Sequence, residues 1–424
     1  MAEPRAVSRR LLYVVAESWP TFRQDVAVLF GRALPRLGLE SDLVALHEGR
    51  PPPPPWGGGA ALLRAAPAGT ARRRLGAFWH ALRALGGARR ERYAALQVRD
   101  LPVVATLALA VGAWKKLPVY YWMSYPMPEG QIALARERGL SAGWMKWAYP
   151  MASGLVGRAL LRHVVLRRAD HVFVQSERMR EELHALGVPW QRLTPVPMGV
   201  DLEAVAALRG VAAPRADGVR VIGYLGSLDR PRRIERLFEM LARVRERLPQ
   251  ARLLIVGGTE DAVHERWLRQ RAQALGVDAA IDWAGWLPTA EGWARLAAAE
   301  VALSPFPRGP LLDSASPTKV PEYLALGLPV VCNDNPDQQA VIAACGAGRC
   351  VPYTPEAFAA AVLELLALPA QERAAMADAG RRWVERHRDY RRIARDVAAA
   401  YAALGVGSAA AALPAGRTLG ERGG

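Results

Sequence analysis

A lysine and a glutamate lie three residues apart in a segment that predicts a short helix. Lys319 and Glu322 belong to the stretch SPTKVPEYLALGLPVV, which starts at Ser316. Proline is tolerated only in the first turn of a helix and glycine often follows the last turn, so we expect a helix from near Thr318 to Gly327, with Ser316 or Thr318 as its cap. The first N–H groups of such a helix, together with a lysine, can bind phosphate oxygens. A carboxylate one turn further on can accept paired hydrogen bonds from a vicinal diol such as ribose, and the alternative is a surface Lys–Glu pair.

Glycines that follow two expected strands offer a second approach for phosphate. Gly226 and Ser227 follow the first of these strands, and Gly257 follows the next. Glycine lets backbone N–H groups come close to a ligand, although a tight turn is the alternative and the spacing is not that of a P-loop or a dinucleotide fingerprint. Arg232 opens the helix expected over 232–248, where a cation is unfavourable by about a few tenths of a kcal/mol against the helix dipole. A bound anion would offset that cost.

The elements that must position these residues alternate between strand and helix. Expected strands in the first half are 11–16, 41–46, 96–98, 119–124 and 171–175, and in the second half 219–225, 252–256, 281–283, 301–303 and 329–332. Expected helices are 21–37, 75–95, 103–115, 144–168, 232–248 and 359–401. Repeated strand–helix units predict an α/β protein with parallel, doubly wound sheets, which bind ligands outside the carboxyl ends of their strands.

The alternation pauses between residues 195 and 218, which predicts a domain boundary. We therefore expect two tandem Rossmann-like domains, 1–205 and 206–385, with a cleft between them. A helix over 386–404 is expected to cross back to the first domain, and the small residues of 405–424 predict a disordered tail. A length of 424 residues agrees with two domains, because a single core usually stops growing at about 250–300 residues.

Charge and composition limit the classes of partner. The net charge of +16 and the pI of about 10.4 favour anionic partners such as phosphorylated small molecules, acidic lipids or nucleic acid, and a surface solvated by arginine is the alternative. No apolar run reaches the roughly 18–20 residues of a membrane span, and no secretory signal is expected in the first ten residues. Three cysteines without paired metal spacing fit a reducing compartment. A cytoplasmic location is expected.

Several motifs of the second half resemble those of a known family. Ser316-Pro317-Thr318-Lys319, Glu322-Tyr323, Gly327 and Pro329-Val330-Val331 resemble the donor-binding signature of the retaining group 1 (family 4) glycosyltransferases of GT-B fold. The resemblance extends to YLGSLD at 224–229 with Arg232, LIVGG at 254–258, WAGW at 283–286, VQSE at 174–177 and PMGVD at 197–201. It covers most of the second domain and the end of the first.

This resemblance implies a set of donor-binding residues. Glu322 matches the ribose-binding glutamate, Lys319 and the amides near Thr318 match the phosphate loop, and Arg232 takes the place of a phosphate-binding lysine. Trp286 and Leu287 fall where the family holds the nucleobase. The implied donor-binding set is Gly226, Ser227, Arg232, Gly257, Trp286, Leu287, Ser316, Pro317, Thr318, Lys319 and Glu322. The family's acid eight residues before Glu322 is replaced by Ser314, which leaves Asp313 as a nearby substitute and puts the usual sugar contact in doubt.

The implied reaction transfers a sugar from a UDP- or GDP-linked donor to an acceptor hydroxyl with retention of configuration. Arg232 and Lys319 are expected to stabilise the departing diphosphate. Candidates on the acceptor side, at carboxyl ends of first-domain strands, are Asp100 and Glu129 as catalytic groups and Glu17, Arg99 and Tyr125 as acceptor-binding groups. Loop charges without a role are the alternative for these five residues. The sequence lacks an Asp-x-Asp motif, so we expect no metal and no cofactor besides the donor.

Basic and aromatic residues in the first domain predict a membrane surface as a partner. Arg72-Arg73-Arg74 precede Phe78 and Trp79, and a second segment contains Trp144, Trp147, Arg158 and Arg162. These compositions suit an anionic lipid surface on the inner face of the cell membrane and an acceptor that is a sugar or a lipid-linked sugar; a solvated helix face is the alternative. Cell-surface polysaccharide or glycolipid synthesis is the expected role.

A sugar-nucleotide epimerase of the same fold is the rival function. A nucleic-acid binder is a third possibility, but it should show basic residues interleaved with stacking aromatics, which we do not find.

Overall fold

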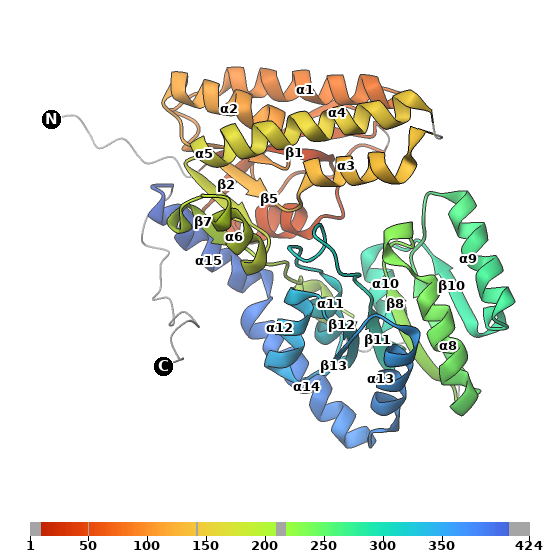
Figure 1. Ribbon diagram of the computed structural model, residues 1–424. Helices are drawn as coiled ribbons and strands as arrows, with labels where there is room; N and C mark the ends of the chain where they lie inside the picture. The colour runs from red at the N-terminus through yellow and green to blue at the C-terminus, as the bar shows by residue number, and fades with distance from the viewer. Residues whose placement is uncertain (1–9, 50, 141–142, 209–217, 407–424) are drawn as a thin grey trace. The chain divides into compact units, whose positions relative to one another are not determined.

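The computed structural model describes residues 10–49, 51–140, 143–208 and 218–406. These residues form two compact units, one reaching Pro197 and resuming at Tyr390, the other spanning Met198 to Asp389 (Figure 1). The sequence placed the corresponding domain ends at 205 and 385. Residues 209–217, within the expected boundary segment, and 407–424, most of the expected tail, lie outside the described residues.

The first unit contains a parallel sheet in the order β3-β2-β1-β4-β5-β6-β7. Its strands are β1 (Arg10–Ser18), β2 (Glu40–His47), β3 (Ala61–Ala65), β4 (Ala95–Arg99), β5 (Val119–Met123), β6 (His171–Val174) and β7 (Leu193–Pro195). The sequence did not predict β3 and β7. Both are edge strands: β3 has no buried residue, and β7 has only three residues and ends in proline. Neither carries the continuous apolar run that marks a buried parallel strand.

Helices cover both faces of this sheet. They are η1 (Asp25–Ala33), η2 (Pro35–Leu37), α1 (Thr70–Gly87), α2 (Pro102–Lys115), α3 (Met127–Arg138), α4 (Trp144–Leu160), η4 (Leu161–Val165), α5 (Leu166–Arg168), α6 (Glu177–Ala185), η5 (Trp190–Arg192) and the last helix, α15 (Tyr390–Ala403). The sequence analysis missed α3, because it treated the residues after β5 as a loop. Pro128 fits the first turn of α3, where a proline needs no N–H donor.

The two faces of the first sheet follow from the alternation of side chains along a strand. Leu12 and Val14 of β1 pack in a core with α1 and α2, whereas Leu11 and Tyr13 pack in a second core with η1 and α15. Tyr401 of α15 belongs to this second core and is fully buried. Side chains with period two thus serve two layers of helices.

The second unit contains a parallel sheet in the order β10-β9-β8-β11-β12-β13. Its strands are β8 (Arg220–Leu225), β9 (Ala251–Val256), β10 (Ile281–Gly285), β11 (Val301–Ser304), β12 (Val330–Asn333) and β13 (Gly348–Val351). Its helices are α7 (Leu202–Ala206), η6 (Arg230–Arg232), α8 (Glu235–Arg247), α9 (Ala262–Ala274), η7 (Asp278–Ala280), α10 (Thr289–Leu296), α11 (Lys319–Ala325), α12 (Pro336–Cys345), α13 (Pro355–Ala367) and α14 (Ala370–His387). The prediction of two doubly wound parallel sheets is confirmed.

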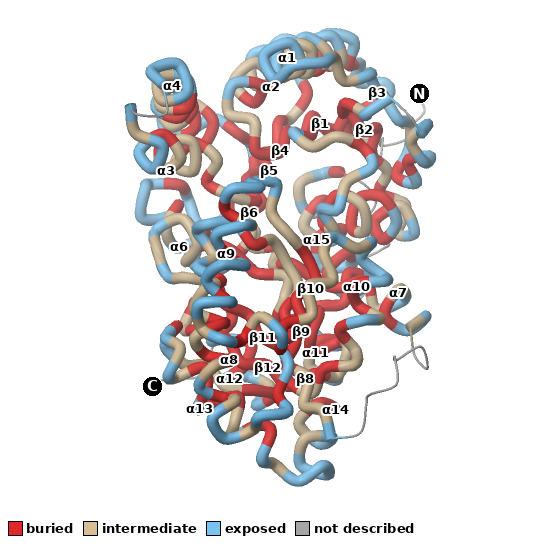
Figure 2. The backbone as a smooth tube through the Cα atoms, turned by 90° about the vertical axis from the view of Figure 1, so that its right-hand side faces the viewer, coloured by how far each residue is buried: buried red, intermediate tan, exposed pale blue. Residues whose placement is uncertain are grey.

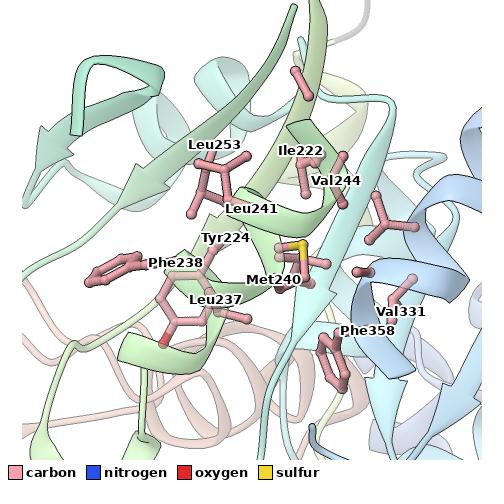
Figure 3. Close-up of a cluster of buried hydrophobic side chains, with 14 of the residues drawn as sticks. Ile222, Tyr224, Leu237, Phe238, Met240, Leu241, Val244, Leu253, Val331 and Phe358 are labelled. Carbon is pink, nitrogen blue, oxygen red and sulfur yellow. The ribbon is translucent and has the colours of Figure 1, made fainter. Parts of the chain in front are cut away.

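Apolar burial holds α8 against the centre of the second sheet. Leu237, Phe238 and Leu241 of α8 lie against Ile222 of β8 and Leu253 of β9 (Figure 3). All five are fully buried, and burying such a side chain contributes about 1.5–3 kcal/mol. Accordingly, most residues along the central strands are buried, as the red parts of the tube show (Figure 2).

Each sheet has one point at which the strand order reverses. In the first unit it lies between β1 and β4, and in the second between β8 and β11. Ligands of open α/β sheets bind outside the carboxyl ends of strands at such points.

Candidate active site

The carboxyl end of β8 is joined to α11 by one tyrosine. The Tyr323 hydroxyl accepts a hydrogen bond from the Leu225 N–H (2.9 Å) and donates one to the Leu225 carbonyl oxygen (3.2 Å). This contact places Lys319, the first residue of α11, over Gly226. A Cβ atom at Gly226 would lie 2.4 Å from Lys319 Nζ, and Gly226 has a φ of 151°. Only glycine gives the lysine room there.

A second glycine brings the next strand end to the same place. Gly257, with a φ of 133°, lies so close to the preceding loop that a Cβ atom would be 2.1 Å from the Gly226 carbonyl oxygen. The neighbouring Gly258 packs under Trp286, because a Cβ atom there would lie 2.8 Å from the indole Nε1. Trp286 is 63% exposed and Leu287 is half-buried. The loops after β8, β9 and β10 are therefore neighbours, and an exposed indole stands beside them.

Arg232 is partly exposed, but one nitrogen of its guanidinium group is buried and unpaired within the described residues. Its guanidinium lies 4.4 Å from the centre of the Phe306 ring, and its Nη1 is buried with no hydrogen-bond partner among the described residues. A buried N–H donor left unpaired costs about 1–3 kcal/mol, more on a charged group. An anionic ligand would satisfy this donor.

The setting of Arg232 differs from the prediction. It ends the short turn η6, whereas α8 begins only at Glu235. The Tyr353 hydroxyl lies within hydrogen-bonding distance of two carbonyl oxygens of this turn, at 3.2 Å from that of Arg232 and 2.7 Å from that of Arg233. The expected conflict between Arg232 and the α8 dipole is therefore wrong, since Arg232 does not open that helix.

Lys319 and Glu322 titrate in each other's field within the protein interior. Burial and the nearby Arg232 together lower the pKa of Lys319 to about 8, and Glu322 opposes this change. Burial also raises the pKa of Glu322 to about 7, against the opposing effect of Lys319. Glu322 is 6% exposed. Two partly exposed cations and one buried carboxyl group are thus held together, and their partial removal from water strengthens their action on a charged ligand.

Ser316 anchors the loop before α11 instead of capping the helix. Its hydroxyl accepts hydrogen bonds from the Met198 N–H (3.1 Å) and from Arg388 Nη1 (3.0 Å), and donates one to Asp337 Oδ2 (2.9 Å). Arg388 also pairs with Asp337 at 2.7 Å. The N-cap is Thr318, whose side chain makes no capping hydrogen bond within the described residues. Ser316 thus positions the loop, and the buried Pro317 follows it.

Arg388 and Asp337 are residues that the sequence analysis missed. They lie 72 and 21 positions from Ser316 along the chain. No local spacing connects residues so far apart, because the contact arises only when α12 and the end of α14 pack beside the loop.

The proposed substitute for the missing family acid is already engaged. Asp313 accepts hydrogen bonds from Arg308 Nε (2.8 Å) and Nη2 (3.0 Å), and Ser314 is buried beside it. A carboxylate held by an arginine in this bidentate manner is fixed in direction.

At the β1–β4 switch point of the first unit, predicted residues meet in an ion-pair network. Arg99, 1% exposed, pairs with Glu17, with Asp25 (2.9 Å) and with Asp100 (3.1 Å). The Asp100 carboxylate also accepts hydrogen bonds from the Ser124 N–H (2.8 Å) and hydroxyl. Although burial disfavours its charged form, the surrounding carboxylates raise the pKa of Arg99 well above its usual value. Arg99 is enclosed by these acids, so it positions them.

Asp25 is a further member that the sequence analysis missed. Its only sequence signal is an acid in the first turn of the helix after β1. Like Glu17 Oε2, the Oδ1 oxygen of Asp25 is buried without a hydrogen-bond partner in the described part of the chain.

Asp100, in the same group, has a raised pKa because it is buried, although the charge of Arg99 opposes this rise.

Glu129 and Tyr125 stand apart from the Arg99 ion pairs. Glu129 lies on α3 and pairs with Arg162 of η4 at 3.1 Å. Arg162, expected to face a membrane, is therefore partly occupied by this pair. The Tyr125 ring packs on Gly130, where a Cβ atom would lie 2.8 Å away, and the Tyr125 N–H is 3.4 Å from Asp100 Oδ1. Tyr125 is thus joined to Asp100 through its backbone.

Within the residues described, no three His, Cys, Asp or Glu side chains gather as a metal site would require. No helix in those parts of the chain is long and apolar enough to cross a membrane.

Family models match both halves of the chain. Residues 25–204 match the model described as Glycosyltransferase Family 4, and residues 219–368 match the one described as Glycosyl transferases group 1. The chain therefore belongs to the group 1 glycosyltransferases, and it is a glycosyltransferase. No curated protein sequence matches it significantly.

Solved structures of similar fold include several glycosyltransferases. HepE from Anabaena, in complex with UDP, is 14% identical with a TM-score of 0.66, over 93% of this chain and 100% of its own. Sucrose-phosphate synthase from Thermosynechococcus elongatus is 19% identical with a TM-score of 0.67, over 93% of this chain and 99% of its own. WaaG, a glycosyltransferase involved in lipopolysaccharide biosynthesis, is 15% identical with a TM-score of 0.59, over 92% of this chain and 98% of its own. The fold is the two-domain, Rossmann-like GT-B fold.

Proposed function

We propose that this glycosyltransferase moves a sugar from a UDP- or GDP-linked donor to an acceptor hydroxyl with retention of configuration. The observation that carries the proposal is the meeting of Lys319, Arg232 and Glu322 beside Gly226, at the strand ends of the second unit. A solved structure of similar fold, HepE, was determined with UDP and with UDP-glucose, which supports a nucleotide sugar as donor. Retention is proposed from the resemblance to the retaining members of the family.

The two cations act on the leaving group. As the bond between sugar and diphosphate breaks, negative charge grows on the diphosphate oxygens. The Lys319 ammonium lies beside the Gly226 backbone, and Arg232, whose Nη1 has no partner among the described residues, is near enough to lower the pKa of Lys319, so both cations need little rearrangement to stabilise that charge. In this proposal no metal ion and no further cofactor are needed, because these two side chains neutralise the diphosphate.

Glu322 and Trp286 bind the nucleoside. A buried carboxylate accepts two hydrogen bonds from the ribose hydroxyls, and such charge-assisted bonds are strong. The exposed Trp286 indole, beside Gly258, offers a flat apolar face to the base. Ser227, Gly257, Leu287, Pro317 and Thr318 line the same strand ends, and Ser316 holds their loop in position through Arg388.

The acceptor is proposed to be a sugar or a lipid-linked sugar, bound by the first unit near Asp100. The enzyme would work in the cytoplasm at the inner face of the membrane, in cell-surface polysaccharide or glycolipid synthesis. One solved structure of similar fold, WaaG, is described as acting in lipopolysaccharide biosynthesis. Asp100 and Glu129 are both proposed as catalytic groups there, and each already pairs with an arginine, Arg99 for Asp100 and Arg162 for Glu129.

The test has two stages. Thermal unfolding is first measured with UDP, GDP and their glucose, galactose and mannose derivatives. A ligand at 100 times its dissociation constant adds about 2.7 kcal/mol of stability. The nucleotide sugar that stabilises the protein most is then incubated with the enzyme and a lipid extract as the source of acceptor. The anomeric configuration of the product is determined by NMR. Stabilisation by one nucleotide and a retained anomer support the proposal, whereas no stabilisation by any nucleoside diphosphate contradicts it.

A further inference from the structure

A cavity of about 380 Å³ lies within the first unit at the carboxyl ends of β1, β2 and β4. Apolar side chains of the sheet and of the helices α1, α2 and α3 form most of its wall, among them Val14, Leu46, Phe78, Val104 and Met127. None of these residues has a part in the donor site. A cavity with such a wall favours a hydrocarbon ligand over a sugar, which would leave its hydroxyls unpaired.

Two polar side chains of the wall, His80 and Asp100, are engaged within the unit, and the others are Arg74, Gln131, Tyr149 and Ser153. The His80 ring nitrogen Nε2 lies 2.8 Å from the Leu62 carbonyl oxygen, and Asp100 is bound by Ser124 and Arg99. Arg74 is different, because its guanidinium lies over the Tyr149 ring at 4.5 Å and both residues are exposed while lining the cavity. The wall thus places one accessible cation at its solvent-facing side.

The helices that carry Arg74 and Tyr149 have outer surfaces suited to a bilayer. Neither α1 nor α4 contains an aspartate or a glutamate, and their cations are Arg72, Arg73, Arg74, Arg83, Lys146 and Arg158, of which Arg73 pairs with Glu48. Trp79 of α1 is 53% exposed and Trp144 of α4 is 71% exposed, together with Leu75, Met145 and Val156. Both helices contact α2 (Figure 1). Basic residues combined with exposed aromatic and aliphatic side chains fit an anionic lipid surface.

We propose that this cavity binds the hydrocarbon chain of a lipid acceptor, an isoprenyl or acyl chain whose phosphate lies at Arg74. The chain enters between α1 and α4 from the bilayer and rests on Val14, Val104 and Phe78. The identity of the lipid as acceptor rests on the proposed function, whereas the binding of an anionic lipid to the cavity does not. In this proposal the first unit binds the hydrocarbon chain of the acceptor.

The first measurement is the binding of decyl phosphate, titrated below its critical micelle concentration and followed by the heat released in calorimetry. The wild-type protein is expected to bind one decyl phosphate, to bind decanol more weakly, and to give no measurable heat with inorganic phosphate. Arg74→Gln should bind decyl phosphate no better than decanol. Equal binding of inorganic phosphate and decyl phosphate would mean that a free phosphate site, and not a lipid site, is present, and would overturn the inference.

Variants that fill the cavity test its location. Ala77→Phe adds a ring from α1, and Ser153→Phe adds one from the opposite wall on α4, so that one remains informative if the other does not fold. Keeping two or three methylene groups out of the cavity corresponds to roughly 10–50-fold weaker binding of decyl phosphate. The matched controls Ala71→Phe and Ala152→Phe place the same side chain at exposed positions of α1 and α4 outside the cavity, and should bind as the wild type does.

UDP binding by the same proteins separates the two proposals. The cavity variants should bind UDP as the wild type does, because Ala77 and Ser153 belong to the first unit and the donor residues to the second. Failure of the wild type to bind either UDP or GDP contradicts only the proposed function. Failure of the wild type to bind decyl phosphate, or unchanged binding in both cavity-filling variants, overturns the lipid site.

Discussion

At the scale of single residues, the donor site consists of charges that the fold keeps out of water. Burial shifts the pKa of Lys319 downward and that of Glu322 upward, and it leaves one nitrogen of Arg232 without a partner among the described residues. Each of these states is unfavourable in the free protein, and the nucleoside diphosphate that we propose as ligand would relieve it. The same burial that makes the free site unfavourable therefore favours ligand binding.

A pH dependence follows from Lys319. Diphosphate attracts the protonated lysine and the ribose needs the charged Glu322, so UDP affinity should be highest between the Glu322 pKa of about 7 and the Lys319 pKa of about 8, and should fall as the pH rises through the latter. Above that pKa the dissociation constant should rise by up to about tenfold per pH unit, the slope of one proton. Calorimetric titration of UDP between pH 7 and pH 10 measures this. Lys319→Arg, which stays charged, is the control and should show little change; a flat profile in the wild type would contradict the assignment.

Glu322 should affect donor binding more than turnover. If it holds only the ribose, it contributes equally to the ground state and the transition state. Glu322→Gln should then raise the donor KM by the loss of about 1–3 kcal/mol for a charged hydrogen bond, with kcat much less changed. Steady-state kinetics with the preferred donor provides both constants. A large fall in kcat at unchanged KM would place Glu322 at the reacting sugar instead.

At the scale of elements, the site depends on how strand ends and helix starts are fixed. Tyr323 fastens α11 to β8, Tyr353 lies against the turn that carries Arg232, and Ser316 fastens the loop before α11 to Arg388. These three contacts determine where the donor residues lie, although none of their side chains is assigned to touch the donor. They are positioning contacts.

Removing one of these contacts should loosen the loop without emptying the site. Ser316→Ala leaves Arg388 and Asp337 with fewer partners in a buried place, and should lower the free energy of unfolding by about 1–3 kcal/mol. The donor KM should rise at the same time. The control is Thr354→Ala, which removes the cap of α13 at a cost of about 1 kcal/mol and should leave KM unchanged. Denaturant unfolding and kinetics check both; equal KM values in the two variants would show that Ser316 has no positioning role.

The sequence predicted much of the fold because buried parallel strands leave clear apolar runs, such as Leu11 to Ala16. It missed β3, whose residues are all at least partly exposed, and α3, whose start was taken for a loop. In the site, Lys319, Glu322 and Gly226 were predicted from residue types next to strand ends. Asp25, Asp337 and Arg388 were not, since their contacts join residues far apart along the chain and depend on packing alone.

At the scale of the whole molecule, the net charge of +16 calls for an anionic partner. The donor diphosphate accounts for Arg232 and Lys319, but the cations of α1 and α4 lie on other elements, with no acidic residue on either helix. We propose an anionic membrane surface as their partner. The protein is therefore expected at the membrane although no described helix crosses it.

Membrane association should depend on salt and on these helices. The wild type is expected to co-sediment with vesicles that contain anionic phospholipid at low salt, and to be released by salt as charges are screened. Arg72→Gln and Lys146→Gln should each weaken association by about 1 kcal/mol. Arg247→Gln, an exposed arginine of the second unit, is the matched control and should have no effect. Absence of co-sedimentation at low salt would contradict the proposed membrane association.

We propose that Arg232 stabilises the negative charge that develops as the diphosphate leaves. The decisive measurement is the kcat of Arg232→Ala. Electrostatic stabilisers of this kind contribute about 10²–10³-fold to kcat, so a fall of that size is predicted, with the smaller effect on KM. Arg230→Ala is the matched control, because Arg230 is exposed on the same turn and pairs with Asp261. Circular dichroism confirms that both variants are folded. A wild-type kcat in Arg232→Ala would contradict the account, because the diphosphate would then lie elsewhere.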